Sequence, residues 1–299
     1  MAKWGSSRGN SLGYKIFITL IKTAGVFPAY GLLRLVTLYY FIFPGKAAKP
    51  LMYYFRKRLG YSYLKAKWAV YENFNYLGRS IIDKFVLMSG MPSPFTRNDD
   101  GIDHLNQMVE RGTGGLLVSA HVGNWEAAGH LLKRLKTKIN IVMYDGEHEK
   151  IKQYLDSVRE RSFNVILIKN DISHIYEINE AIRRNEFVCI HADRFVEGNR
   201  TIEGKLLGAT AKFPIGPFVL ATTFEAPVSF VFALKEGVKH FHFFASPGKV
   251  YPKGKPGIEA MLEDYLRKVE TMIKAYPLQW HNYFPFWNEE LVQQNLTNK

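Results

Sequence analysis

Residues 114–132 read GGLLVSAHVGNWEAAGHLL. It begins with an uncharged apolar run, which is typical of a strand buried on both faces of a parallel sheet. His121 follows the run directly, Gly123 marks a turn, and a helix is predicted to begin near Glu126. A strand, a turn and a helix in this order predict one unit of an α/β sheet. His121 would then lie at the carboxyl end of its strand, where ligand sites of such sheets gather.

Similar units follow along the chain. The sequence predicts strands at 115–120, 139–144, 164–168, 187–191, 228–234 and 240–244, and helices at 102–112, 126–135, 149–161, 173–184, 215–223 and 258–276. This alternation predicts an α/β fold with a mixed central sheet flanked by helices. Residues 90–101 are predicted to be a loop because they are rich in Pro, Gly and Asp. The glycines form neither a dinucleotide-binding nor a Walker-type phosphate-binding motif.

Composition excludes several classes of protein. The chain has 299 residues and is 47% hydrophobic, so it can bury a large core and is not globally disordered. Its one cysteine, Cys189, excludes an intrachain disulfide and a metal site built from several thiolates.

The net charge of +13 is a property of the N-terminal part of the chain. Residues 1–71 contain 12 Lys or Arg and no acidic residue, whereas residues 101–299 contain 25 basic and 23 acidic side chains. Such a segment favours an anionic partner, which can be nucleic acid, membrane headgroups or an acidic protein. No nucleic-acid recognition module is visible, and the basic residues flank long apolar runs, so we expect no nucleic acid partner.

The same segment is strongly apolar. Within residues 14–45 the longest uncharged runs, 23–33 and 35–45, are shorter than the roughly 20 residues that a spanning helix needs. We interpret residues 1–90 as a helical region that lies in a membrane interface and residues 91–299 as the α/β domain. Four tyrosines would lie at headgroup level, namely Tyr39, Tyr40, Tyr53 and Tyr54. An apolar packing helix of a soluble domain and a single membrane span are the alternatives.

The spacing of His121 and Glu126 leaves three interpretations open. Glu126, in the first turn of a helix, could accept a hydrogen bond from one ring nitrogen of His121, so that the other nitrogen acts as a general base. Alternatively, a metal could bind to Glu126 and His130, four residues apart on one helix face, together with His191 and Asp193 after another strand. Finally, His121 could be purely structural.

Several motifs resemble one family. HVGNWE resembles the His-x4-Asp/Glu motif of the glycerolipid acyltransferases, and specifically the His-x-Gly-Asn-Trp-Glu form of the late acyltransferases of lipid A biosynthesis. HADRFVEGN (191–199), residues 205–232 and YPLQWHNYFPFWN (276–288) resemble further blocks of that family, so the resemblance covers roughly residues 14–290. The C-terminal block departs from the family pattern at residues 283–286. The acceptor therefore stays open between a lipid A precursor, an amino-acid lipid and another hydroxylated lipid or pigment.

The resemblance implies transfer of a fatty acyl group from an acyl thioester to a lipid hydroxyl. It implies that His121 removes the hydroxyl proton, Glu126 orients His121, and Arg159 stabilises the oxyanion, with Arg161 as the neighbouring alternative. Further residues would shape the substrate site or position the acceptor: Gly123, Asn124, Trp125, Arg161, Asp193 and Arg194.

The resemblance also implies partners and a location. We expect acyl carrier protein, or coenzyme A, as the carrier of the acyl group, and we expect no cofactor and no metal. The other partners would be anionic membrane lipid and the lipid acceptor, at the cytoplasmic face of the inner membrane. Two other functions remain: an acyl hydrolase or thioesterase that uses the same dyad with water, and a non-catalytic lipid-binding scaffold. The oligomeric state is not predicted.

Overall fold

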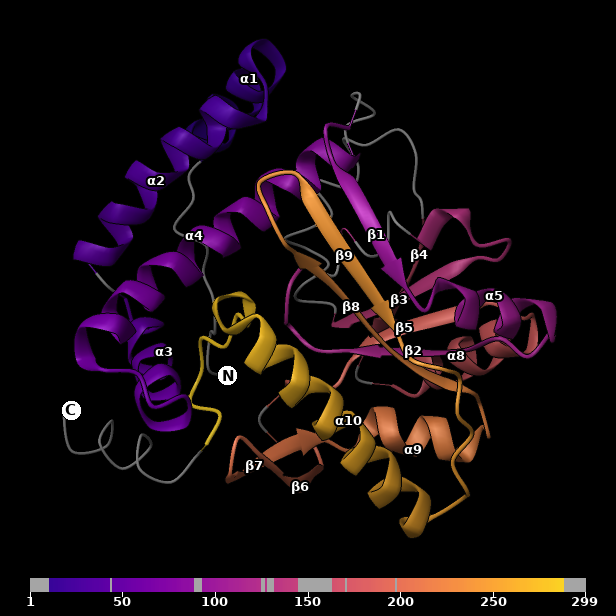
Figure 1. Ribbon diagram of the computed structural model, residues 1–299. Coiled ribbons are helices and arrows are strands. Elements are labelled where there is room, and N and C mark those ends of the chain that lie inside the picture. Colours follow the sequence, from indigo (N-terminus) through magenta and orange to yellow (C-terminus); the bar gives the residue numbers. More distant parts are fainter. Residues whose placement is uncertain are drawn as a thin grey trace.

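The N-terminal part of the chain is a group of helices beside the sheet (Figure 1). The computed structural model describes residues 11–43, 45–88, 93–124, 127, 132–144, 163–169, 171–196 and 198–287. The helices are α1 (Ser11–Ala24), α2 (Val26–Ile42), α3 (Ala48–Tyr53), the π-helical turn Tyr54–Arg58, and α4 (Tyr63–Met88). Their presence confirms that residues 14–90 are mostly helical. Within the described residues, none of these helices has the length and apolarity needed to cross a bilayer.

A seven-stranded mixed sheet forms the centre of the α/β part. Its order is β1-β9-β8-β2-β5-β3-β4, and every neighbouring pair is parallel except β8 and β9. The strands are β1 (Thr96–Asp100), β2 (Gly115–Ser119), β3 (Ile139–Tyr144), β4 (Asn164–Ile168), β5 (Phe187–His191), β8 (Val228–Lys235) and β9 (His240–Ala245). All six predicted strands are present, which confirms the mixed α/β sheet.

Helices flank this sheet where the sequence predicts them. They are α5 (Ile102–Glu110), α8 (Ser173–Arg183), α9 (Gly216–Thr223) and α10 (Lys255–Ala275) (Figure 1). Of the predicted helix at 126–135, only Ala127 and residues 132–135 belong to the described residues, and Leu132–Arg134 form a 3-10 turn. The predicted helix at 149–161 lies outside them.

One prediction of irregular structure is wrong, and one hairpin was not predicted. Residues 96–100 are not loop but β1, an edge strand that pairs with β9, with the Thr96 N–H donating to the Lys239 carbonyl at 2.9 Å. A two-stranded hairpin, β6 (Thr201–Leu206) and β7 (Ala209–Pro214), forms where no strand is predicted. β1 and β6 are rich in polar residues and largely exposed, and β7 buries only Ala211, Phe213 and Pro214, so the uninterrupted apolar runs that reveal buried strands are missing from them.

The main hydrophobic core joins the N-terminal helices to the sheet. Every residue of β2 is buried, which explains its uninterrupted apolar sequence. Leu116 and Val118 of β2 belong to the same core cluster as Leu51, Tyr54 and Phe55. Tyr54 is fully buried, and its hydroxyl donates to the Pro277 carbonyl at 3.0 Å. The prediction that Tyr54 lies at headgroup level is therefore wrong, because this ring is a core residue.

A buried ion pair connects α4 to Lys235, the last residue of β8. The Lys235 Nζ donates to the Asp83 carboxylate at 2.5 Å and to the Tyr30 hydroxyl at 2.7 Å, and that hydroxyl in turn donates to Asp83. The Lys235 and Asp83 side chains are 4% and 0% exposed. Burial lowers the pKa of Lys235 and raises the pKa of Asp83, and the opposite charge of each partner counters these shifts.

We expect Asp83→Asn to lower the free energy of unfolding by about 3–5 kcal/mol, because it leaves the buried Lys235 ammonium without its counter-charge. Urea unfolding followed by circular dichroism measures this loss. Glu259→Gln, which breaks the exposed pair with Lys255, is the matched control and should cost less than about 1 kcal/mol. Equal unfolding midpoints for the two variants would contradict a stabilising role for the buried pair.

Candidate functional site

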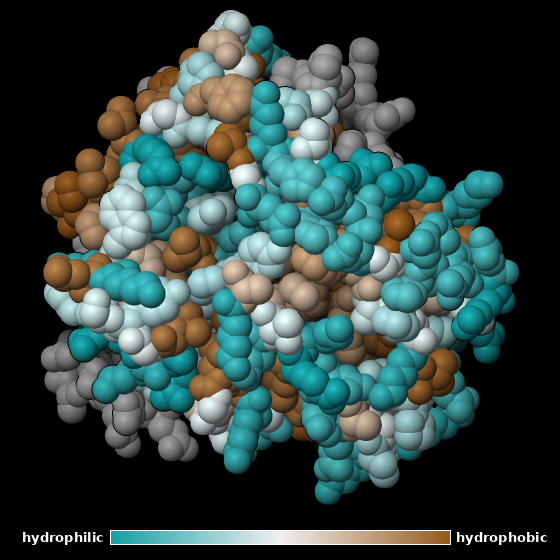
Figure 2. Space-filling model, in the orientation of Figure 1, coloured by the Kyte–Doolittle hydropathy of each residue, from teal (hydrophilic) through white to brown (hydrophobic). Residues whose placement is uncertain are grey.

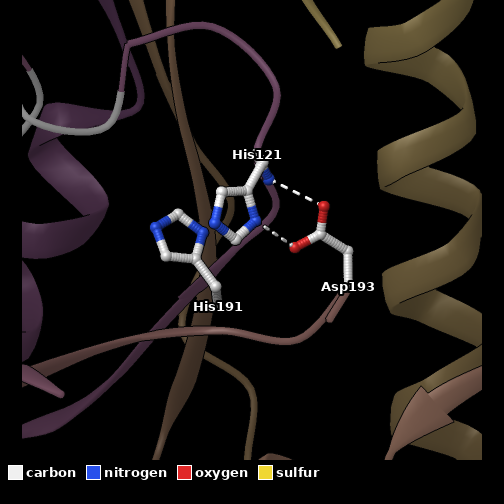
Figure 3. Close-up of side chains that lie close together, drawn as sticks. All are labelled: His121, His191 and Asp193. Atoms are coloured by element: carbon white, nitrogen blue, oxygen red, sulfur yellow. Dashed lines mark hydrogen bonds and ion pairs between the residues drawn. The ribbon is translucent and has the colours of Figure 1, made fainter. Parts of the chain in front are cut away.

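His121 and Asp193 lie together at the carboxyl edge of the sheet. His121 follows β2 by two residues and Asp193 follows β5 by two residues. These strands are parallel neighbours, with Ser119 opposite His191, so their ends meet at one edge. The His121 Nδ1 lies 2.7 Å from the Asp193 Oδ1, and the His121 main-chain N–H donates to Oδ2 at 2.9 Å (Figure 3).

Asp193 is held as a carboxylate inside the protein. It is 2% exposed, and its Oδ2 also accepts a hydrogen bond from the Trp280 indole at 3.4 Å. Burial alone would raise its pKa, but the charge and hydrogen bond of His121, together with Arg194, hold that pKa well below its ordinary value. An ionised carboxylate only accepts hydrogen bonds. The His121 Nδ1 therefore carries the proton of this contact, and Nε2 carries the lone pair that a general base needs.

The turn after His121 depends on Gly123. This residue has a φ of 79°, and a Cβ added there would lie 2.1 Å from the Ala233 carbonyl oxygen. Only glycine fits such a close approach at a positive φ. The next residue, Asn124, accepts a hydrogen bond from the Ala127 N–H at 3.0 Å, as a helix-capping Asn does. Both residues shape the turn, and their predicted contact with substrate stays a prediction.

The C-terminal segment after α10 is hydrogen-bonded to this turn. The His281 N–H donates to the His121 carbonyl at 2.9 Å, and the Gly123 N–H donates to the Gln279 carbonyl at 2.8 Å. The Gln279 side-chain amide pairs with both main-chain groups of Lys235 at 2.9 Å. Sequence reasoning missed Gln279, Trp280 and His281 as parts of the site. The signal for them was the dense mixture of polar and aromatic residues in 276–288.

His191 is the third side chain of the cluster. Its ring stacks on that of His121 with a centroid distance of 4.4 Å and an angle of 27° between the planes (Figure 3). His121, His191 and Asp193 each offer a ligand atom within 4.8 Å of the others, which brings together two of the four residues in the predicted metal set. The other two, Glu126 and His130, lie outside the described residues.

A dyad accounts for this cluster better than a metal site does. Both Asp193 oxygens already accept hydrogen bonds from N–H groups, and the His121 Nδ1 is one of those donors. A metal between His121 and Asp193 would have to displace that direct contact. The bonding of the carboxylate therefore supports an oriented imidazole.

Arg194 lies beside the dyad. Its guanidinium donates to the His281 carbonyl and lies over the Phe284 ring, 5.8 Å from the centroid. Asp193 and Arg194 lie next to His121, as expected for residues of one site. The direct pairing of Asp193 with His121 was not predicted. The remaining predicted site residues lie outside the described residues: Trp125, Glu126, Arg159 and Arg161. The predicted contact between His121 and Glu126 therefore stays a prediction.

The sequence matches a known protein family. The sequence profile described as bacterial lipid A biosynthesis acyltransferase matches residues 70–288, which include the dyad and the C-terminal segment. A phosphatidylinositol mannoside acyltransferase of Mycobacterium tuberculosis is 27% identical over 196 residues, 64% of this chain and 60% of that protein. A protein of the same name from Mycolicibacterium smegmatis is 25% identical over 198 residues, 64% of this chain and 63% of that protein. The match thus spans less than two thirds of these relatives.

Proposed function

We propose, from the premise that the chain belongs to the bacterial lipid A biosynthesis acyltransferase family, that it transfers a fatty acyl group from an acyl thioester to a hydroxyl of a membrane lipid. One observation carries the proposal. The His121 Nδ1 contacts a buried carboxylate at 2.7 Å, which leaves Nε2 to act as a base. The His121 side chain is 20% exposed, so the ring reaches the surface from an otherwise buried strand end.

The reaction needs no acyl-enzyme. The His121 Nε2 removes the proton of the lipid hydroxyl as its oxygen attacks the thioester carbonyl carbon. The tetrahedral intermediate then collapses, the carbon–sulfur bond breaks, and the imidazolium returns the proton to the departing sulfur. Asp193 stabilises the imidazolium through Nδ1. We retain Arg159, with Arg161 as its alternative, as the proposed donor to the oxyanion.

The proposed acceptor is a phosphate-bearing glycolipid. The family is described by lipid A biosynthesis, and the mycobacterial relatives are named for phosphatidylinositol mannoside. Both names point to a hydroxyl on a sugar-bearing anionic lipid, and we place a lipid A precursor first. We propose acyl carrier protein as the acyl donor, because this acidic protein suits a chain with a net charge of +13. We propose no metal and no cofactor.

The test is mass spectrometry of total lipids from cells that lack this protein, complemented with wild type or with His121→Ala. We expect one lipid to lose an acyl chain in the deletion strain and to regain it only with wild type, which also identifies the acceptor. An unchanged lipid profile would contradict the proposal. Cleavage of the thioester by purified protein at the same rate with and without lipid would favour the hydrolase alternative.

We also propose that the N-terminal helices bind the cytoplasmic face of the inner membrane. Residues 45–70 carry seven basic and no acidic side chains. Large apolar side chains are exposed on α2 and at the start of α4: Leu35, Leu38, Tyr39, Ile42, Phe43, Tyr63, Leu64 and Trp68. Figure 2 shows brown side chains gathered over α2 at the left edge of the molecule. Apolar side chains among basic ones suit an anionic bilayer surface.

Ring contacts connect α2 and α4 beside these exposed side chains. The Tyr71 ring centroid lies 5.2 Å from that of Trp68 and 5.8 Å from that of Phe41 at the end of α2. We define the membrane patch as the exposed apolar residues of α2 and α4 named above. Of the tyrosines that the sequence places at headgroup level, Tyr39 belongs to this patch and is 56% exposed.

We expect the double variant Leu64→Glu/Trp68→Glu to bind phosphatidylglycerol-containing vesicles at least about tenfold more weakly than wild type, because it puts charge where apolar side chains enter the interface. Vesicle co-sedimentation measures binding, and added salt should weaken it further. Tyr176→Glu, on the exposed face of α8, is the matched control with an exposed aromatic ring. Equal binding by both variants would exclude this patch as the membrane contact.

A further inference from the structure

His191 is a largely buried imidazole for which the proposed reaction has no role. It ends β5, and its ring lies face to face with that of His121 at 4.4 Å (Figure 3). A hydrogen bond to the Ala120 main chain holds the His191 ring in place. The ring is thus fixed on one side by a strand end and presents its face to the proposed base.

The surroundings of His191 affect its protonation. Burial, followed by the nearby charge of His121, lowers the pKa of His191 to about 3. These surroundings favour the neutral form of the His191 ring. Among the described residues, the other groups near the pair are Asp193 and Arg194 after β5, His281 in the C-terminal segment and Tyr265 on α10.

We propose that His191 is a positioning residue for the general base, its ring fixing the plane of His121 so that Nδ1 meets Asp193 while Nε2 faces the lipid hydroxyl. This inference rests on the proposed function. The carboxylate fixes the direction of one ring nitrogen, and the stacked His191 ring restricts tilting of the His121 ring about that contact. A shift of about 1 Å in a reacting group can cost about 100-fold in rate. The face of a neutral aromatic ring also attracts the imidazolium that forms during the reaction.

Two variants distinguish the effect of ring stacking from the effect of filling the space beside His121. His191→Phe keeps an aromatic ring against His121, whereas His191→Leu fills the site without one. We expect His191→Phe to keep kcat within a few fold and to leave the acid limb of the pH–kcat/KM profile in place. His191→Leu should lower kcat by about 10–100-fold with the KM for lipid unchanged. Its acid limb should move to lower pH, because the protonated form of the base loses the stacked ring.

Proton NMR of the free protein provides a readout that needs no substrate. The Nδ1 proton between His121 and Asp193 should give a strongly downfield signal in wild type and in His191→Phe, and this signal should weaken or vanish in His191→Leu. His174→Leu, on α8, is the matched control for loss of an imidazole. An unchanged kcat, pH profile and NMR signal in His191→Leu would overturn the inference. So would equal losses in both His191 variants with the pH profile and signal unmoved. If wild type shows the signal but transfers no acyl group, the proposed function fails separately.

Discussion

His121→Ala is expected to lower the rate of acyl transfer by about 10²–10⁴-fold, the usual contribution of a positioned general base. The physical reason is that Nε2 of this ring carries the lone pair at the carboxyl ends of the strands, while Nδ1 is hydrogen-bonded to Asp193. The fold should survive, because the turn is held by main-chain hydrogen bonds to Gln279 and His281 and β2 is held by its pairing with β5 and β8. Initial rates with an acyl thioester and the lipid acceptor measure the loss.

The control for this variant is its folding. Circular dichroism and vesicle binding of His121→Ala should match wild type, and His174→Ala on α8 should match it in rate as well. Aggregation of His121→Ala would mean that the ring is a packing residue and would return His121 to the structural interpretation that its sequence left open.

Asp193→Asn is expected to cost about 10⁴-fold in rate, of the size seen when a buried Asp that orients a catalytic His is replaced by Asn. The amide NH₂ group can donate to Nδ1, which would move the ring proton to Nε2 and remove the base. The variant also lacks the negative charge that stabilises the imidazolium. Single-turnover rates measure this loss, with Asp103→Asn, an exposed Asp on α5, as the matched control.

The pH dependence of wild type follows from the same pair. The pKa of Asp193 is held well below its ordinary value, so this carboxylate stays ionised throughout the range in which enzymes work. Any loss of activity between pH 5 and 8 should therefore come from a group other than Asp193. Titration of the Asp193 carboxylate in that range, followed by carbon-13 NMR, would contradict this ionised state.

The buried strands of the fold were predictable, and the exposed ones were not. The sequence predicts β2 and β5 because their apolar runs reflect burial on both faces. It predicts no strand at β1, since TRNDD has no apolar side chain and depends on pairing with β9. The burial of Tyr54 escaped prediction for a related reason, because it results from contacts with a segment more than 200 residues away.

The candidate site was predictable in part. His121 could be named because the strand, the motif and the turn are all local in sequence. Asp193 was recognised only as a neighbour of the site, because its pairing with His121 across 72 residues depends on β2 and β5 being adjacent. Nothing in the sequence gives that strand order. The hydrogen bonds of Gln279 and His281 to the turn, and the stacking of His191 on His121, also join residues that are distant in sequence. They could not be predicted for the same reason.

The proposed mechanism requires Asp193 as the carboxylate that orients the base. The most direct measurement compares Asp193→Asn, Glu126→Gln and Asp103→Asn in one assay of acyl transfer from acyl carrier protein to the lipid acceptor. Asp193→Asn should be nearly inactive, with a loss of about 10⁴-fold, while Asp103→Asn stays at the wild-type rate. Wild-type activity in Asp193→Asn together with loss of activity in Glu126→Gln would contradict the account and assign the orienting role to the motif carboxylate.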